Sequence, residues 1–180
     1  MFSKSDRTIM GLKSKLGKIY AANAVKKIKK WAENPIDTQQ KVFRELITQA
    51  SATAFGEDHN FNAITTYEDF KKNVPIRDYE DLTSYIESAR SGEENILWKG
   101  KPIYFCKTSG TTSGTKYIPI SKESISNHID CARNALLCYI NESGNTEFIN
   151  GKMIFLQGSP VLEEENGIQV GRLSGIVAHH

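Results

Sequence analysis

The stretch "FCKTSGTTSGTKYIPIS", residues 105–121, decides how this chain is interpreted. At its centre, positions 108–115 are all Thr, Ser or Gly, and Lys107 and Lys116 stand at the two ends. These residues offer hydroxyl groups and closely spaced backbone N–H groups, and glycine permits left-handed backbone conformations. Successive N–H groups folded into a nest bind anions, and a lysine adds a positive charge suited to phosphate. The composition therefore predicts either a phosphate-binding loop or a plain surface turn.

The spacing within this loop excludes the common nucleotide-binding patterns. A P-loop has four residues between its glycines and then Gly-Lys-Ser/Thr, and a dinucleotide-binding loop has the pattern G-x-G-x-x-G. Here three residues separate Gly110 from Gly114. Thr115 then precedes the lysine, and Tyr117 follows it. If the loop binds phosphate, it does so with a different geometry.

The residues around the loop predict two strands and a helix. The apolar run "IYFCK", residues 103–107, favours a strand, and "KYIPI", residues 116–120, is extended because the residue before Pro119 avoids the helical region. Ser121 is placed to cap the following helix. Apolar residues of that helix recur at a helical period: Ile125, Ile129, Ala132, Leu136, Leu137 and Ile140.

Beyond this helix the pattern predicts one more strand and an irregular end. The run "KMIFLQGSP", residues 152–160, reads as an apolar strand broken by its glycine and proline. The last segment, "EEENGIQVGRLSGIVAHH", residues 163–180, predicts a turn, a short strand and a loop.

The first hundred residues predict helices joined by short loops. Within residues 34–55 we expect a helix with a cap at Asp37 or Thr38 and one apolar stripe, made by Val42, Phe43, Leu46, Ile47 and Ala50. Residues 65–75 predict a short helix that stops before its proline. Residues 77–92 predict a helix from a cap at Asp78 to a stop at Gly92.

The order of elements predicts an α/β fold. We expect residues 1–99 to be a helical N-terminal segment and residues 100–180 to be the start of an α/β nucleotide-binding core, together one incomplete domain. Two or three strands make a poor sheet alone, so the 180 residues are expected to be the front of something longer.

The N-terminus is strongly basic. Residues 1–30 hold nine Lys or Arg and one acidic residue, although the whole chain has a net charge of +2. The apolar residues among them recur at roughly helical spacing: Met10, Leu12, Leu16, Ile19, Tyr20, Val25, Ile28 and Trp31. Such a helix can lie on a membrane or contact nucleic acid. The commoner arrangement, expected here, docks the apolar stripe on its own domain and leaves the lysines in water.

The cysteines and the hydropathy predict a cytoplasmic protein. None of the three cysteines lies in a C-x-x-C pair or at zinc-ligand spacing near histidine, and three are too few for a disulfide framework. Cys131 and Cys138 are seven residues apart on one helical face and are expected to be buried. The N-terminus has no signal-peptide core, and no run of 18 apolar residues occurs.

The loop resembles a motif of a known superfamily. "TSGTTSGTK", residues 108–116, is similar to the first core motif of the adenylate-forming enzymes, the acyl-CoA synthetase and luciferase group, which is close to T-S-G-T-T-G-x-P-K. Six residues fall in register: Thr108, Ser109, Gly110, Thr111, Thr112 and Lys116. Ser113 replaces the expected glycine, and Thr115 replaces the expected proline.

The flanking sequences narrow the resemblance to one branch. "NPIDTQQKVFRELITQASATAFG", "YEDFKKNVPIRDYEDLTSYIE" and "GEENILWKGKPIYF" resemble, in order and spacing, the lead-in of the Gretchen Hagen (auxin-responsive promoter) family of acyl-acid amido synthetases in its bacterial form. The similarity runs from about residue 30 to the end. That branch has one more residue between the second glycine and the lysine.

The resemblance implies an ATP-dependent ligase with a luciferase-like mixed sheet. A carboxylic acid attacks the α-phosphate of ATP to give an acyl-adenylate and pyrophosphate, and an amine such as an amino acid then forms the amide and releases AMP. The implied partners are ATP, a small carboxylic acid and an amine, and the ligand of the implied Mg²⁺ is expected outside this chain. The implied phosphate-binding residues are Thr108, Ser109, Gly110, Thr111, Thr112, Ser113, Gly114 and Lys116.

Two further residues are candidates for the acid-binding site. In related enzymes the helix after the loop lines the acyl pocket, which implies that Arg133, with His128 one turn earlier, can face a substrate carboxylate. The alternative for Arg133 is a partly exposed helix arginine. Two other functions stay open: a truncated, non-catalytic module that binds nucleotide or phosphate, and an interaction domain that uses the basic N-terminal helix.

Overall fold

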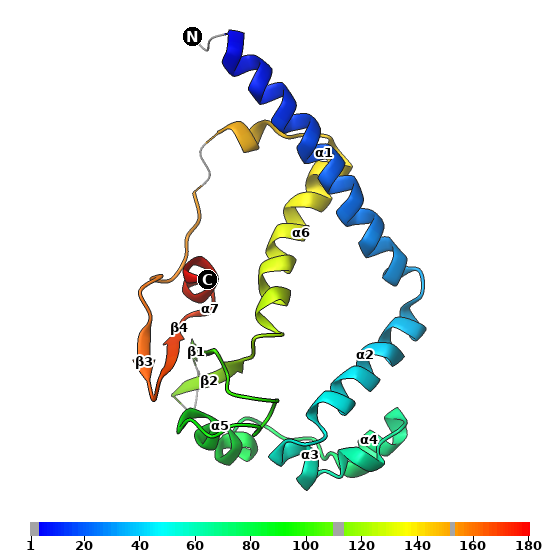
Figure 1. Cartoon of the computed structure of the whole chain (residues 1–180), viewed down its shortest axis with the longest axis vertical. Coiled ribbons are helices and arrows are strands. Elements are labelled where there is room, and N and C mark those ends of the chain that lie inside the picture. Colours follow the sequence, from blue (N-terminus) through cyan, green and yellow to red (C-terminus); the bar gives the residue numbers. More distant parts are fainter. Residues whose placement is uncertain (1–3, 110–113, 152–153) are drawn as a thin grey trace. The chain divides into compact units, whose positions relative to one another are not determined.

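The computed structural model describes residues 4–109, 114–151 and 154–180. The chain divides into two compact units: the first is Met1–Thr38 with Asn127–Leu156, and the second is Gln39–Ser126 with Gln157–His180. The helices and strands are labelled in Figure 1.

The first unit is helical. It contains α1 (Lys4–Ala32), nearly all of α6 (Ile125–Ser143) and the short 3₁₀ helix η3 (Glu147–Asn150). Its core consists of Ala21 on α1 with Leu137 and Ile140 on α6. Small residues on α1 allow this packing, since a Cβ added at Gly17 would lie 3.2 Å from the Ile149 side chain. The helix predicted after Ser121 is confirmed, and Ser121 Oγ accepts a hydrogen bond from the backbone N–H of residue 124 at 3.1 Å.

The second unit begins with helices. These are most of α2 (Pro35–Ala50), and all of α3 (Ala54–Asp58), η1 (Phe61–Ala63), α4 (Tyr67–Asn73), η2 (Glu80–Leu82) and α5 (Thr83–Arg90). Their first core consists of Ile47, Ala50, Phe61 and Ile64, and aromatic rings such as Phe43 and Phe70 pack around it. The helix α4 has the predicted stop before Pro75, and a capping box between Thr66 and Asp69 fixes its start.

The strands form a mixed sheet. Among the described residues, β1 (Tyr104–Ser109), β2 (Thr115–Ile120), β3 (Glu163–Glu165) and β4 (Ile168–Gly171) make a four-stranded sheet in the order β2-β1-β4-β3. The strand β1 is antiparallel to β2 and parallel to β4, and β3 is antiparallel to β4. This arrangement is the mixed sheet after a helical lead-in that the sequence predicted.

Helices cover the two faces of β1. Phe105 pairs with Val170 and packs on Ile86 and Ala89 of α5. The side chain of Tyr104 points to the opposite face. Its hydroxyl forms a 3.2 Å hydrogen bond with Nδ1 of His180, the residue that follows α7 (Leu173–His179). Because Phe105 and Val170 are each 1% exposed, this strand pair is the core of the second unit.

The hairpin of β3 and β4 depends on its two turn residues. Asn166 and Gly167 have φ angles of 51° and 76°. Positive φ at both central positions is the requirement of a type I′ turn, whose twist matches the twist of the two strands. The sequence predicted this turn and β4, and it missed β3.

Two predictions of secondary structure are wrong. The described residues from 154 to 160 form no strand, and Ile154 and Leu156 are 90% and 101% exposed. An apolar run becomes a strand when it finds a pairing partner, and no described strand pairs with this segment. Residues 173–179 form α7 instead of a loop, and Gly175 in this helix lets the backbone approach the Ser159 carbonyl.

The other errors concern side-chain exposure and helix starts. Cys131 and Cys138 are exposed, because α6 buries a different stripe through Leu137 and Ile140. The helix α2 begins at Pro35, two or three residues before the predicted caps. The division into segments 1–99 and 100–180 stays a prediction.

Candidate functional site

The Ser/Thr/Gly loop lies at the tip of the β1–β2 hairpin. Ser109 pairs with Thr115, so residues 110–114 connect the two strands. Gly110, Thr111, Thr112 and Ser113 lie outside the described residues. Gly114 has a φ of +81°, a conformation that L-residues rarely adopt, and nothing lies within 4 Å of a Cβ built there. The strands therefore hold the two ends of the loop side by side, with Thr108 opposite Lys116.

Lys116 is held at the base of the loop by two residues of the helical region. Its Nζ lies 3.4 Å from Oε1 of Glu80 and 4.8 Å from the centroid of the Tyr79 ring. The Tyr79 hydroxyl also accepts a hydrogen bond at 2.8 Å from the backbone N–H of Tyr117. Since β2 is the edge strand, Tyr79 satisfies an outward-facing donor and fixes Glu80 beside the lysine.

Lys107, the other lysine that borders the loop, is bound to the acidic strand β3. Its ammonium donates a hydrogen bond to Glu163 and lies 3.8 Å from Oε1 of Glu165. The hydrogen bond to Glu163 raises the pKa of Lys107 above its ordinary value, against the opposing effect of burial. Lys107 is therefore a neutralised cation that joins β1 to β3.

Arg90 lies on the same face of the sheet and covers Tyr117. The guanidinium carbon is 3.7 Å from the ring centroid, and the guanidinium donates hydrogen bonds to Glu87 at 2.8 Å and Glu165 at 2.7 Å. Burial acts to lower the pKa of Arg90, but the hydrogen bonds to Glu165 and Glu87 outweigh it and raise the pKa. Arg90 Nε is buried without a partner among the described residues.

The geometry around the loop is thus a set of cations already paired with carboxylates. Lys116 has Glu80, and Lys107 and Arg90 share Glu165. Because each of these cations is paired with a carboxylate, the described side chains near the hairpin tip offer no excess of positive charge. An incoming phosphate can bind to backbone N–H groups and hydroxyls of the loop, and it can compete with a carboxylate for an ammonium group.

His128 and Arg133, the two candidates for the acid-binding site, are exposed residues of α6 in the first unit. Arg133 donates to Asp130, three residues earlier, at 2.8 Å. This is the contact of a solvent-facing helix arginine, the alternative that the sequence left open. A role for either residue in binding a carboxylate stays a prediction.

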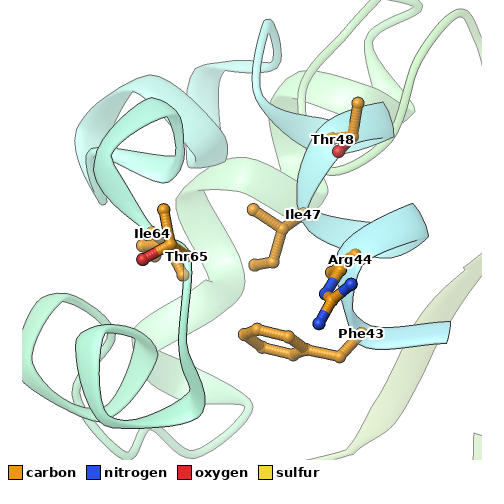
Figure 2. Close-up of a pocket in the computed structure, with 6 residues that line it drawn as sticks. All are labelled: Phe43, Arg44, Ile47, Thr48, Ile64 and Thr65. Carbon is orange, nitrogen blue, oxygen red and sulfur yellow. The ribbon is translucent and has the colours of Figure 1, made fainter. Parts of the chain in front are cut away.

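A pocket that the sequence did not predict lies beside α2 in the second unit. Figure 2 shows Ile47 and Phe43 facing Ile64 across it. Its volume is about 390 Å³, and its other lining residues are Arg44, Thr48 and Thr65. An apolar floor with a guanidinium at its side suits a small apolar group with an anionic end. No sequence pattern marks this pocket, because its two walls are separated along the chain by α3 and η1.

The described residues hold no obvious metal site. No group of three or more His, Cys, Asp or Glu among them is placed to bind a metal ion. In the described part of the chain there is also no helix of the length and apolar character needed to cross a membrane.

Comparison with known proteins identifies similar sequences. The family model described as the GH3 family N-terminal domain matches residues 24–180. Indole-3-acetic acid-amido synthetase GH3.15 of Arabidopsis thaliana is 32% identical over 136 residues, which are 73% of this chain and 22% of the relative. Jasmonoyl–L-amino acid synthetase JAR6 of Nicotiana attenuata is 27% identical over 138 residues, 74% of this chain and 23% of the relative.

Solved structures show the same fold. The acyl acid amido synthetase AtGH3.15 in complex with 2,4-DB superimposes with a TM-score of 0.77 at 21% identity, over 88% of this chain and 28% of that one. A second structure, named GH3.15 acyl acid amido synthetase, gives a TM-score of 0.68 at 23% identity, over 78% of this chain and 26% of that one. The chain spans about a fifth of the length of the curated relatives it matches, from 16% to 23%.

Proposed function

Because the chain belongs to the GH3 family, we propose that it is the N-terminal portion of an ATP-dependent acyl-acid amido synthetase. This ligase adenylates a carboxylic acid and transfers the acyl group to an amine such as an amino acid. The names of the relatives support this reaction, since they are indole-3-acetic acid-amido and jasmonoyl–L-amino acid synthetases. The proposed enzyme is an adenylate-forming, cytoplasmic member of the luciferase-like group, in the bacterial form of the family.

In the first half-reaction, the acid carboxylate attacks the α-phosphorus and pyrophosphate leaves. In the second, the amine nitrogen attacks the acyl carbonyl, AMP leaves with the bonding electron pair, and the nitrogen loses a proton. The first half-reaction places negative charge on the departing pyrophosphate. Its main need is therefore a set of fixed donors around the triphosphate, and no covalent nucleophile of the protein is required.

The single observation that carries the proposal is the position of the "TSGTTSGTK" segment at the turn between β1 and β2. The paired strands fix the residues at each end, Thr108 and Ser109 on one side and Thr115 and Lys116 on the other. The sequence between them consists of small residues, and a loop of small residues can offer its backbone N–H groups to phosphate oxygens. The proposed donors are the hydroxyls of Ser109, Thr111 and Thr112 and the N–H groups near the two glycines.

Lys116 has a conditional role in this scheme. Its ammonium group is bound to Glu80, so it reaches a phosphate either by leaving that carboxylate or by bridging the two anions. Lys116 is partly buried, with 27% of its side chain exposed, and Glu80 is 51% exposed. A pair this accessible to water is weak enough to exchange partners. Magnesium would share the neutralisation of the triphosphate, and its protein ligand is expected outside this chain.

The alternative is a module that binds nucleotide or phosphate without completing the reaction. Binding and turnover separate the two proposals. A module of this kind would bind ATP in a calorimetric titration but would show no ATP–pyrophosphate exchange with any acid.

The test is ATP–pyrophosphate exchange by the full-length protein across a panel of carboxylic acids. We expect exchange with at least one acid, and we expect the triple variant Ser109→Ala/Thr111→Ala/Thr112→Ala to lose about 100-fold in kcat/KM for ATP, because several charge-directed hydrogen bonds are removed together. The matched control removes three exposed hydroxyls outside the loop, Ser84→Ala/Ser126→Ala/Ser143→Ala, and should retain exchange. Exchange by the loop variant at the wild-type rate would refute the role of the hydroxyls, and no exchange with any acid would refute adenylation.

A further inference from the structure

The long basic helix α1 has two different apolar faces. The inner face consists of small residues that pack in the first unit: Ala21 is fully buried, and Gly17 lies against Ile149 and Thr146 of the η3 region. A hydrogen bond between the hydroxyls of Ser14 and Thr146 adds to this contact. Successive residues of a helix turn by about 100°, so positions 14, 17 and 21 share one side.

Four larger apolar residues in the first half of α1 lie on the outer side. Leu12, Leu16, Ile19 and Tyr20 are 59%, 56%, 60% and 52% exposed. They follow the i, i+4, i+7, i+8 spacing of a single helix face, opposite the buried one, and extend for about 12 Å. These four residues are called the outer patch below. The expected docking of the apolar stripe on the protein is therefore wrong for these four residues, which remain exposed, whereas Val25 and Ile28 of the same stripe are half-buried on the side of Ala21.

Positive charge surrounds and continues the outer patch. Residues 11–32 contain seven lysines and no aspartate or glutamate: Lys13, Lys15, Lys18, Lys26, Lys27, Lys29 and Lys30. By helical spacing, Lys26, Lys27 and Lys30 continue the face of the outer patch toward the end of the helix. Within the described residues no salt bridge involves any of the seven, in contrast to Lys107 and Lys116 in the second unit.

We propose that the outer patch and its lysines bind the surface of an anionic lipid bilayer. The helix lies in the plane of the interface, with the leucine, isoleucine and tyrosine side chains among the headgroups and upper acyl chains and the ammonium groups against lipid phosphates. This inference does not depend on the proposed ligase activity. It adds a peripheral membrane contact to a chain whose described helices do not cross a membrane.

The combination of residues favours a lipid surface over other occupants. Nucleic acid binding uses the lysines but gains nothing from four exposed apolar side chains in a row. A second copy of the chain would bring two lysine-rich, acid-free faces together, and like charges repel. An anionic bilayer satisfies the two features at once, since it has negative charge at its surface and apolar chains beneath.

The test is co-sedimentation of the whole protein with vesicles of phosphatidylcholine alone or phosphatidylcholine mixed with phosphatidylglycerol. We expect at least about tenfold stronger partitioning onto the mixed vesicles, and a loss of about tenfold when NaCl is raised from about 0.05 M to about 0.5 M. Leu16→Ser/Ile19→Ser and Lys26→Gln/Lys27→Gln/Lys30→Gln should each weaken binding about tenfold, since each removes one of the two contributions.

Two matched controls test whether binding depends on the outer patch and its lysines or only on the overall number of exposed apolar and basic residues. Val42→Ser/Leu46→Ser removes two apolar residues of similar exposure from α2, and Lys41→Gln/Lys71→Gln/Lys72→Gln removes the same charge from the second unit. Both controls should bind vesicles as the wild type does, and circular dichroism should show that all four variants are folded. The proposal is overturned if the wild type does not bind mixed vesicles, or if controls and test variants weaken binding equally. It is likewise overturned if duplex DNA is bound more tightly and binding is insensitive to Leu16→Ser/Ile19→Ser.

Discussion

The ammonium group of Lys116 lies 3.4 Å from the carboxylate of Glu80, a residue 36 positions earlier in the chain. This pair connects the helical region to the start of β2, next to the Ser/Thr/Gly loop. It gives the cation beside the loop a defined position before any phosphate arrives. It also means that the same carboxylate competes with phosphate for that cation.

Replacing Lys116 should affect nucleotide binding far more than stability. We expect Lys116→Ala to raise the KM for ATP in the exchange reaction about tenfold, because a charge-assisted contact to phosphate is lost. The free energy of unfolding should change by less than about 1 kcal/mol, since the pair with Glu80 is partly exposed and screened by solvent. Lys99, which lies 3.5 Å from Glu123, provides the control: Lys99→Ala removes a similar exposed pair and should leave the KM unchanged. Equal KM values for Lys116→Ala and the wild type would remove this lysine from the phosphate site.

Arg90 should be a stability residue. Its guanidinium covers the Tyr117 ring and binds Glu87 and Glu165, so Arg90→Met removes this partner from Glu87 and leaves Glu165 with Lys107 alone beside the sheet. The expected loss is about 2 kcal/mol, reduced from the cost of breaking a fully buried pair because these groups are partly exposed. Urea unfolding measures it. Arg133→Ala, which breaks an exposed i, i+3 pair, should change the same free energy by less than about 0.5 kcal/mol. A loss no larger than that of the control would show that Arg90 contributes only a surface pair.

The sequence predicted the local elements well because their signals are local. The helix α4 has its cap and its stopping proline within a few residues, and the strands on either side of the loop are short apolar runs next to Gly and Pro. The same local information could not reveal β3, because three consecutive glutamates are poor strand residues by themselves. Glu163 and Glu165 are compatible with a strand here because Lys107 and Arg90 lie on the same face of the sheet.

The candidate site was predicted only as a segment of sequence. Nothing in the order of residues indicates that Glu80 and Tyr79 meet Lys116, because this contact depends on how the helices pack at the edge of β2. For the same reason the predicted exposure of α1 and α6 was wrong. Periodicity shows that a helix has an apolar face, but the face that is buried also depends on the size of the residues that allow close approach, such as Gly17 and Ala21.

The three cysteines should differ sharply in reactivity. Cys106 is buried in β1, and burial raises the pKa of its thiol, so less of the reactive thiolate is present at neutral pH. Cys131 and Cys138 are exposed on α6. In the folded protein, iodoacetamide should modify these two at least about tenfold faster than Cys106, as read by mass spectrometry of peptides over time. In urea all three should react at similar rates, and rapid labelling of Cys106 without denaturant would contradict its burial.

Because of Asp69, the second unit should lose stability at acid pH. Hydrogen bonds from the hydroxyls of Thr66 and Thr65 and from their backbone N–H groups lower the pKa of Asp69 from 3.8 to about 2. A lowered pKa means that the folded state binds the proton less readily than the unfolded state. The stabilisation is therefore complete above about pH 4 and is lost as the pH falls through about 2. As the pH falls across this interval, the melting temperature of the wild type should decrease more than that of Asp69→Asn, which has no carboxylate at this position. Parallel curves for the two proteins would show that the capping box does not contribute to the acid sensitivity.

Two glycine-to-alanine substitutions should change the free energy of unfolding in opposite directions. At Gly56, an added Cβ would lie 2.0 Å from the carbonyl oxygen of Ala50, which is backbone and cannot turn aside. Gly56→Ala should therefore shift the α2–α3 connection and destabilise the protein by about 3 kcal/mol. At Gly11, in α1, nothing lies within 4 Å of an added Cβ, and alanine is the better helix former. Gly11→Ala should stabilise the helix by about 0.5 to 1 kcal/mol, because alanine loses less backbone entropy there. Chemical denaturation of the two variants measures these changes, and a neutral Gly56→Ala would mean that the close approach of α3 to the end of α2 is wrong.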